Sequence, residues 1–319
     1  MMQIVLVGLG AGAAAALLFA SVASGSIIAT LLFYLAPLPI LIAALGWSHW
    51  AAVVAMLSAA GGLAAILGTY FFIAFLVGVG APAWWLGYLA LLARPGGTPP
   101  AIEWYPIGRL VLWAAVIGTM VVAVVIPTFG TDKESFQAGL RSAFERAVRL
   151  QAAPGAPTAP DRPEAQRLID ILVLAIPPAA AVLTTLLNVI NLWLAGRIVK
   201  VSGRLRRPWP NLSTLALPPL ASGLLAAAIA GSFLPDLAGI LAGVLAASLF
   251  MAYALVGFAV LHAITRSIGN RGLALGSAYA AVAMFGWPIL GMSLLGLADG
   301  AFDIRARLAR KRGPPTLPT

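Results

Sequence analysis

Long apolar runs separated by short polar segments dominate the sequence of this 319-residue chain. A helix needs about 20 apolar residues to cross the hydrocarbon core of a bilayer, and within that core the backbone must satisfy its own hydrogen bonds. Nine runs meet or approach this length, at residues 3–23, 27–45, 51–67, 70–92, 107–128, 168–194, 215–233, 237–264 and 273–297. None shows the alternation of a membrane β-barrel strand. The pattern therefore predicts an all-α fold, a polytopic transmembrane helical bundle with eight or nine spans.

Two boundaries are less sharply marked than the rest. No Lys or Arg precedes the first run, which argues against a signal peptide and predicts a retained first helix. Between the third and fourth runs, either Gly61-Gly62 or the glycine- and proline-containing segment 78–82 could form the turn.

Residues 131–149 follow a different pattern, which predicts one amphipathic helix outside the bilayer. Thr131 and Glu134 have the spacing of a capping box. The helix that follows has one apolar and one charged face, formed by Phe136, Leu140, Phe144 and Val148 and by Arg141, Glu145 and Arg149. Such a helix lies on the membrane surface or on the protein, either docked there or as a simple tether.

These features divide the chain into four segments. An N-terminal transmembrane half of about five spans covers residues 1–128, and the amphipathic helix with a proline-rich linker covers 129–166. A C-terminal transmembrane half of three or four spans covers 167–300, and a basic tail covers 301–319.

Composition strengthens the membrane assignment and excludes several classes of protein. The chain is 61% apolar and 9% charged, whereas soluble domains are about 45–50% apolar and about 25% charged. It has no cysteine and only two histidines, so we expect no disulfide, no metal site and no cofactor. The net charge of +10 resides in short clusters beside apolar runs, which is typical of loops facing anionic lipid. We therefore expect the lipid bilayer, and no nucleic acid, as a partner.

The basic clusters also predict an orientation, although they leave one conflict. Residues 197–207 contain five basic residues and no acid, which places this loop in the cytoplasm. The basic tail has the same preference, yet three apolar runs separate it from that loop. An odd number of crossings cannot join two cytoplasmic segments. Either one of the last three runs is re-entrant or the tail lies outside.

No set of residues in the sequence points to catalysis. The sequence contains no paired carboxylates, no Ser-His-Asp set and no phosphate-binding glycine loop. Acidic residues lie near the ends of the apolar runs, so the bundle core lacks the ionisable groups that ion-coupled transporters use. We therefore expect a protein that is not an enzyme.

Small and polar residues within the runs supply the candidate sites. A stripe of small residues, Gly8, Gly12, Ala16 and Ala20, recurs every four positions along the first helix. It allows close helix packing, either internally or against a partner membrane protein. Asn188 and Asn191 share a helix face, and their amides either bond to a neighbouring helix or line a polar cavity. Together with His262, near the cytoplasmic end of its run, they are the candidate substrate-binding residues.

The residues of the C-terminal region resemble a known family. The sequence Gly296-Leu297-Ala298-Asp299-Gly300-Ala301-Phe302-Asp303-Ile304-Arg305 is similar to the closing motif of the YybS-like family, domain of unknown function 2232. The stretch from Val256 to His262 resembles the family's preceding helix, with Val256 where a glutamine is expected. Asn191-Leu192-Trp193, Gly196-Arg197 and Arg207-Pro208 are similar to its alphaproteobacterial branch.

This resemblance implies a multi-pass protein of the bacterial cytoplasmic (inner) membrane. The family is remotely similar to substrate-binding subunits of energy-coupling-factor transporters, which use small residues on the first helix to contact a coupling subunit, and to the rod-shape protein MreD. Such subunits have about six helices, fewer than this chain. The leading hypothesis is a small-molecule transport component driven by a partner ATPase, and the alternative is a non-transporting envelope scaffold or assembly factor.

Overall fold

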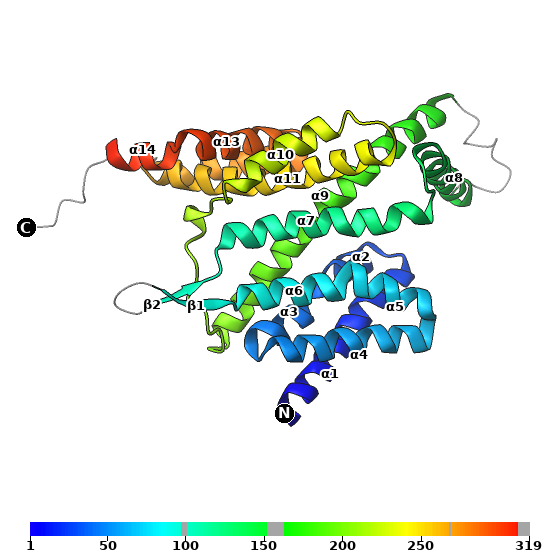
Figure 1. The fold of residues 1–319 in the computed structure, drawn as a ribbon, viewed down its shortest axis with the longest axis horizontal. Coiled ribbons are helices and arrows are strands. Elements are labelled where there is room, and N and C mark those ends of the chain that lie inside the picture. The colour runs from blue at the N-terminus through cyan, green and yellow to red at the C-terminus, as the bar shows by residue number, and fades with distance from the viewer. Residues whose placement is uncertain (97–100, 152–162, 268, 312–319) are drawn as a thin grey trace, which may run out of the picture. The chain divides into compact units, whose positions relative to one another are not determined.

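The computed structural model describes residues 1–96, 101–151, 163–267 and 269–311, which form mostly helices (Figure 1). Within these residues, seven helices are long and apolar enough to cross a membrane: Met2–Ser24, Ile27–Gly46, His49–Leu67, Thr69–Ala90, Ile107–Thr128, Pro163–Val201 and Asp236–Ile264. Shorter apolar helices account for the two remaining runs. The predicted all-α polytopic bundle is confirmed.

The helices form two compact units that are not contiguous in sequence. Unit 1 comprises Met1–Ile117 and Thr184–Asn211, and unit 2 comprises Gly118–Leu183 and Leu212–Thr319. Two long helices, α7 (Ile107–Val125) and α9 (Pro163–Val201), contribute residues to both units. This grouping by contact differs from the four sequence segments, whose boundaries remain a prediction.

Unit 1 is built from an N-terminal series of helices and one small sheet. Its elements are α1 (Met2–Ala20), η1 (Ser21–Ser24), α2 (Ile27–Tyr34), α3 (Pro37–Gly46), α4 (His49–Leu67), α5 (Thr69–Phe75), the π-helical turn η2 (Leu76–Gly80), α6 (Ala81–Ala90), β1 (Ala93–Gly96), β2 (Ala101–Trp104) and parts of α7 and α9. The strands pair antiparallel, with Arg94 opposite Glu103, and these two side chains form an ion pair.

The turn between the third and fourth spans lies at neither predicted position. Gly68 separates α4 from α5 with a φ of 100°, a conformation that favours glycine. Gly61 and Gly62 remain inside α4, and residues 76–80 form a π-helical turn within the fourth span. Both predicted turn positions are wrong because glycine is tolerated inside membrane helices, so its presence alone does not mark a turn.

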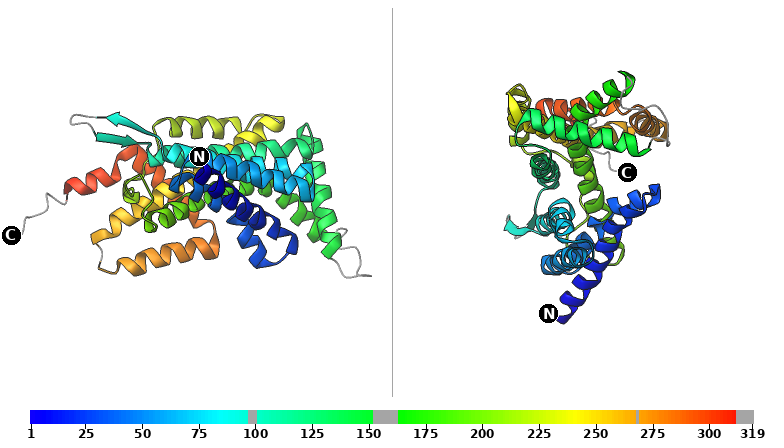
Figure 2. Two further views of the ribbon diagram at one scale, coloured as in Figure 1. Left: turned by 90° about the horizontal axis from the view of Figure 1, so that it is seen from below. Right: turned by 90° about the vertical axis from the view of Figure 1, so that its right-hand side faces the viewer.

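Unit 2 contains most of the C-terminal helices. Its elements are parts of α7 and α9, η3 (Ile126–Thr128), α8 (Lys133–Gln151), η5 (Leu212–Thr214), α10 (Leu220–Gly231), α11 (Asp236–Ile264), η6 (Thr265–Ser267), α12 (Arg271–Phe285), α13 (Pro288–Phe302) and α14 (Ile304–Lys311). In Figures 1 and 2 the last helices of this unit run from orange (α12) to red (α14), and α13 packs along α11.

The amphipathic helix α8 is docked on the protein. Phe136 and Leu140 are buried in a cluster with Ile169 of α9 and Val244 of α11. On another side of α8, Arg141 donates a hydrogen bond to Gln166 and forms an ion pair with Asp170. Docking, rather than a simple tether, is therefore the arrangement observed.

The start of α8 differs by one residue from the prediction. The Ser135 amide donates to Asp132 Oδ1 at 2.9 Å, and the Asp132 amide donates to Ser135 Oγ at 3.2 Å. The predicted capping box of Thr131 and Glu134 is therefore wrong. Both pairs have the required spacing, but a carboxylate is the stronger acceptor for the free amides of the first turn.

The predicted span at 215–233 is interrupted, and its one helix is shorter than the helices able to cross a membrane. Arg266 Nη2 donates to Ser213 Oγ at 2.6 Å, whereas a Cβ on Gly231 would lie 3.0 Å from the Ala242 Cβ. The segment 213–231 therefore runs antiparallel to α11 over about 36 Å, the rise over the 24 residue steps from 242 to 266 at about 1.5 Å each. The 12 residues of α10 supply only about 18 Å of this length. Residues 213–219, including Pro218-Pro219, cover the rest mostly as irregular chain.

The last apolar run forms a hairpin of two helices and returns to the end where it began. Gly286, with a φ of 69°, separates α12 from α13. Tyr279 of α12 stacks on Phe258 of α11, with ring centroids 4.9 Å apart, and beyond α13 the Arg305 side chain reaches Ser213. Each helix has 15 residues, or about 22 Å, less than the roughly 30 Å hydrocarbon core.

The contacts at the two ends of this hairpin bear on the conflict in the orientation argument. Arg266 and Arg305 both bond to Ser213, so the hairpin begins and ends at the same end of α11. The seven long helices are the candidate spans among the described residues, and an eighth crossing by the interrupted segment at 215–233 remains a prediction. Of the two predicted alternatives, the returning run agrees with these contacts.

Candidate functional site

The end of unit 2 that contains Arg266 brings together the histidine and the closing motif singled out in the sequence. His262, in the last turn of α11, lies 3.0 Å from the Tyr279 hydroxyl through Nε2. Tyr279 in turn stacks almost parallel on Phe258, four residues before His262 on the same helix. Tyr279 of the hairpin therefore contacts both an aromatic and a polar side chain on this face of α11.

Two glycines allow α13 to approach α11 very closely. A Cβ on Gly257 would collide with the Met292 carbonyl oxygen, and a Cβ on Gly296 would collide with the Tyr253 carbonyl oxygen. Next to this crossing, the buried Ser293 hydroxyl donates to the Phe250 carbonyl at 2.8 Å. Only glycine lets the two backbones pack at this distance, which is the small-residue mode of membrane helix association.

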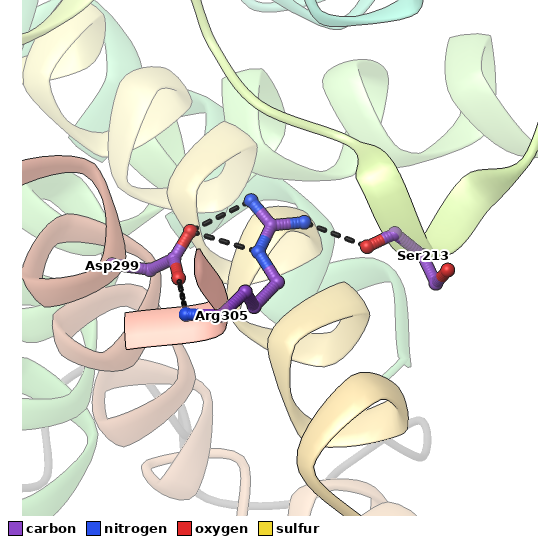
Figure 3. A network of polar contacts seen from close by, with 3 residues as sticks. All are labelled: Ser213, Asp299 and Arg305. Carbon is purple, nitrogen blue, oxygen red and sulfur yellow. Dashed lines mark hydrogen bonds and ion pairs between the residues drawn. The ribbon is translucent and has the colours of Figure 1, made fainter. Parts of the chain in front are cut away.

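An ion pair holds the end of the hairpin (Figure 3). Asp299 is 6% exposed, and its Oδ2 accepts from Arg305 Nε at 2.9 Å and Nη2 at 2.6 Å. Its Oδ1 accepts the Arg305 backbone amide at 3.0 Å. Arg305 Nη1 donates to the Ser213 carbonyl at 2.7 Å. We call these three residues the Asp299 latch.

The local backbone places Arg305 for this contact. Asp303 ends α13 in the left-handed region, with φ 50° and ψ 47°, and its amide donates to the Asp299 carbonyl at 2.9 Å. Aspartate tolerates this conformation better than most residues. The chain reverses there and begins α14, so Arg305 folds back over the last turn of α13.

The contacts of the Asp299 latch indicate a structural role. Its carboxylate oxygens are occupied by the guanidinium and the amide of Arg305, which leaves no evident base for proton transfer. In the described part of the chain, no group of three His, Cys, Asp or Glu residues is arranged to hold a metal ion.

The two predicted amides lie in unit 1, whereas His262 lies in unit 2. Asn191 is fully buried, and its Nδ2 donates to the Tyr34 and Leu187 carbonyls at 2.9 Å each. Its Oδ1 and the Nδ2 of the buried Asn188 have no hydrogen-bond partner in the described part of the chain. Asn191 therefore joins α9 to α2, while one donor and one acceptor of this pair stay available.

The first two small residues of the first helix pack against α4 of the same chain. A Cβ on Gly8 would lie 2.9 Å from the Ala51 carbonyl oxygen, and one on Gly12 would collide with the Ser58 hydroxyl. Ala16 and Ala20 are half-buried. A role for this stripe in binding a partner remains a prediction.

Sequence reasoning missed the latch and two arginines of the basic loop. Asp299 and Arg305 stood within the family-like motif, but six residues separate them, and only the helix end at Asp303 brings them together. Arg204 donates to the Gly46 carbonyl at 3.4 Å, and Arg207 donates to the Ala90 carbonyl at 3.3 Å. These carbonyls belong to the last residues of α3 and α6, where a cation is favourable.

Comparison with known proteins agrees with this architecture. A family described as "Predicted membrane protein (DUF2232)" matches residues 13–300, a range that includes both amides, His262 and Asp299. No curated protein and no solved structure matches the chain. Because the family match covers most of its length, this chain belongs to the DUF2232 family of predicted membrane proteins.

Proposed function

We propose that this protein is a small-molecule transport component of the bacterial cytoplasmic membrane. The observation that carries the proposal is the combination of the interrupted segment at 215–233 and a returning hairpin at the same end of α11. Irregular backbone at membrane depth is tolerated only where it is buried in protein or lines a water-filled cavity. Transporters use such broken helices to expose backbone groups to substrate.

The irregular segment of unit 2 contains backbone amides that could bind water or a ligand. Within the described chain, the amides of Ala216 and Leu217 donate no hydrogen bond to another protein group. An unpaired amide costs several kcal/mol in hydrocarbon, about 2–7 depending on the reference state, so contact with water or a polar ligand is favoured there. His262 and Tyr279 lie at the same end of α11.

The driving force is expected to come from a partner. Between Leu237 and Ile264, α11 contains no Asp, Glu, Lys or Arg, which ion-coupled transporters normally keep in the bundle. The resemblance to energy-coupling-factor subunits suggests an ATPase as the source of energy. In the described chain, Asn188 Nδ2 and Asn191 Oδ1 have no hydrogen-bond partner. This free donor and free acceptor suggest an uncharged substrate that both accepts and donates hydrogen bonds.

The proposal is tested by isolating the tagged protein from its own membranes in mild detergent. We expect mass spectrometry to find one small molecule enriched over a mock purification, together with ATPase subunits. His262→Gln should deplete the molecule, whereas Ala226→Ser, at an exposed position of α10, should not. A folded protein with no enriched molecule, and unchanged uptake on deletion, would contradict transport. Recovery of envelope proteins alone by crosslinking would favour the scaffold alternative.

The arrangement in the membrane can be tested separately, because the chain has no cysteine. Single cysteines at Leu217, Ser202 and Arg307 should react with an impermeant maleimide from the cytoplasmic side. A matched cysteine at Ile229, on the lipid-accessible surface of α10, should remain unlabelled. Labelling of Arg307→Cys only from the outside would contradict the returning hairpin.

A further inference from the structure

The basic loop after α9 divides into two sets of cations with different surroundings. Arg204 and Arg207 bond to the last carbonyls of α3 and α6, and Arg204 also lies over the Trp47 ring, 4.2 Å from its centroid. Burial lowers the pKa of the Arg207 guanidinium below its ordinary value. These two arginines are committed to contacts within unit 1.

Arg197, Lys200 and Arg206 remain exposed. The Arg197 guanidinium carbon lies 5.4 Å, and the Lys200 ammonium 5.1 Å, from the centroid of the Trp209 ring. That ring rests on α9 beside Gly196, where a Cβ would be only 3.4 Å from it. One tryptophan thus holds two cations at the end of a membrane helix.

Among the residues that the structure describes, these three cations have no acidic partner. The ion pairs found in the described ranges involve Arg94, Arg141 and Arg305, and none involves residues 197–207. Residues 197–207 contain no Asp or Glu. Positive charge beside a tryptophan at the end of a span is the composition that places a surface at the level of lipid headgroups.

We propose that Arg197 and Lys200, supported by Trp209, together with the nearby Arg206 of the same loop, bind the phosphate groups of anionic lipids in the cytoplasmic leaflet. Arginine can form paired hydrogen bonds to phosphate, and Lys200 adds a point charge. A basic side chain near an anionic surface strengthens binding by about fivefold, which corresponds to about 1 kcal/mol. Removing three should weaken binding about 100-fold. The site is independent of the proposed transport function.

The test uses the full-length protein in detergent, titrated with phosphatidylglycerol or phosphatidylcholine and followed by native mass spectrometry. The wild type should bind phosphatidylglycerol preferentially. The triple variant Arg197→Gln, Lys200→Gln, Arg206→Gln should lose most of this preference. Trp209→Leu should reduce it in part, because the cations lose their support.

The matched control removes the same charge elsewhere. Arg146→Gln, Arg149→Gln and Arg167→Gln change exposed cations of unit 2 and should leave the preference within about twofold. If both triple variants lose the preference for phosphatidylglycerol equally, the preference depends on net charge alone and the proposed site is wrong. Equal binding of the two lipids by the wild type would also overturn it, and would point to an acidic protein partner. The substituted side chains are exposed, so folding should be retained.

Discussion

The two units both interrupt membrane helices, but they treat the freed backbone groups differently. In unit 1, Pro37 follows the break between α2 and α3, and the Tyr34 carbonyl that leaves the helical ladder accepts from Asn191. Arg204 and Arg207 occupy the terminal carbonyls of α3 and α6. In unit 2, the amides of Ala216 and Leu217 bond to no other group of the described protein.

The two units thus satisfy the backbone groups freed by a helix interruption in two different ways. A side chain that satisfies a freed carbonyl turns a break into a fixed bend, because moving the helix would cost that hydrogen bond. A break left open requires water or a ligand, and the structure around it must be held by other means. In unit 2 those means are the glycine crossing of α11 with α13 and the Asp299 latch.

The largest effect is expected at the glycine crossing. Gly257→Val or Gly296→Val would force a side chain into a backbone carbonyl and separate α13 from α11. We expect a loss of about 3 kcal/mol in the free energy of unfolding, measured by thermal or denaturant unfolding in detergent. Gly300→Ala, where a Cβ meets no atom within 4 Å, is the control and should change little. A tolerated Gly296→Val would show that this contact does not hold the hairpin.

Opening the Asp299 latch should have the next largest effect. Arg305→Ala leaves the nearly buried Asp299 carboxylate without its cation, at a cost of about 2 kcal/mol. Limited proteolysis should then cut the chain after Phe302 faster. Arg305→Lys should restore only part of the stability, since a single ammonium cannot reproduce the bonds of the guanidinium. Arg307→Ala, at an exposed position, should resist proteolysis like the wild type.

At the bend between α2 and α3, substitution of Asn191 should lower the free energy of unfolding, whereas substitution of Asn188 should not. Asn191→Leu removes the donor to the Tyr34 carbonyl and should cost about 1 kcal/mol of unfolding free energy. Asn188→Leu removes a donor that has no partner, and should be neutral or stabilising. If a ligand binds this pair instead, Asn188→Leu will lower its occupancy. Equal destabilisation by both substitutions would contradict the distinction drawn between them.

The smallest effect is expected at the cap of α8. Hydrogen bonds from the Ser135 amide, and then from its hydroxyl, lower the pKa of Asp132 below its ordinary value of 3.8. A pKa that is lowered in the folded state stabilises the protein above the ordinary value, and this contribution disappears as the pH falls through the folded-state pKa. The melting temperature of Asp132→Ala should therefore lie slightly below the wild type near neutral pH. The difference should shrink in acid, whereas Lys133→Ala should show no such trend.

The sequence was sufficient for the helices and insufficient for their interruptions. Apolar runs predict spans because lipid leaves the backbone no other partner, and the amphipathic pattern of Phe136 and Leu140 predicted α8. The split at Gly286 was not predicted, since glycine also occurs inside α4 at Gly61 and Gly62.

The candidate site was predictable only in part. His262 was singled out, but its contact with Tyr279 depends on the hairpin, and 17 residues separate the two. Periodicity reports which residues share a helix face, whereas contacts between helices depend on packing that one sequence does not reveal. Asp299 and Arg305 are near neighbours whose pairing required the left-handed Asp303.

The Asp299 latch can form only late in the synthesis of the chain. Ser213 emerges 92 residues before Arg305, with an entire membrane helix and a hairpin between them. The contact between Ser213 and Arg305 therefore cannot form until α11, the hairpin and Arg305 have all been synthesised. A chain cut short before Arg305 would contain every long helix and still lack the ion pair that holds the end of the hairpin, so closure of this unit waits for the synthesis of Arg305.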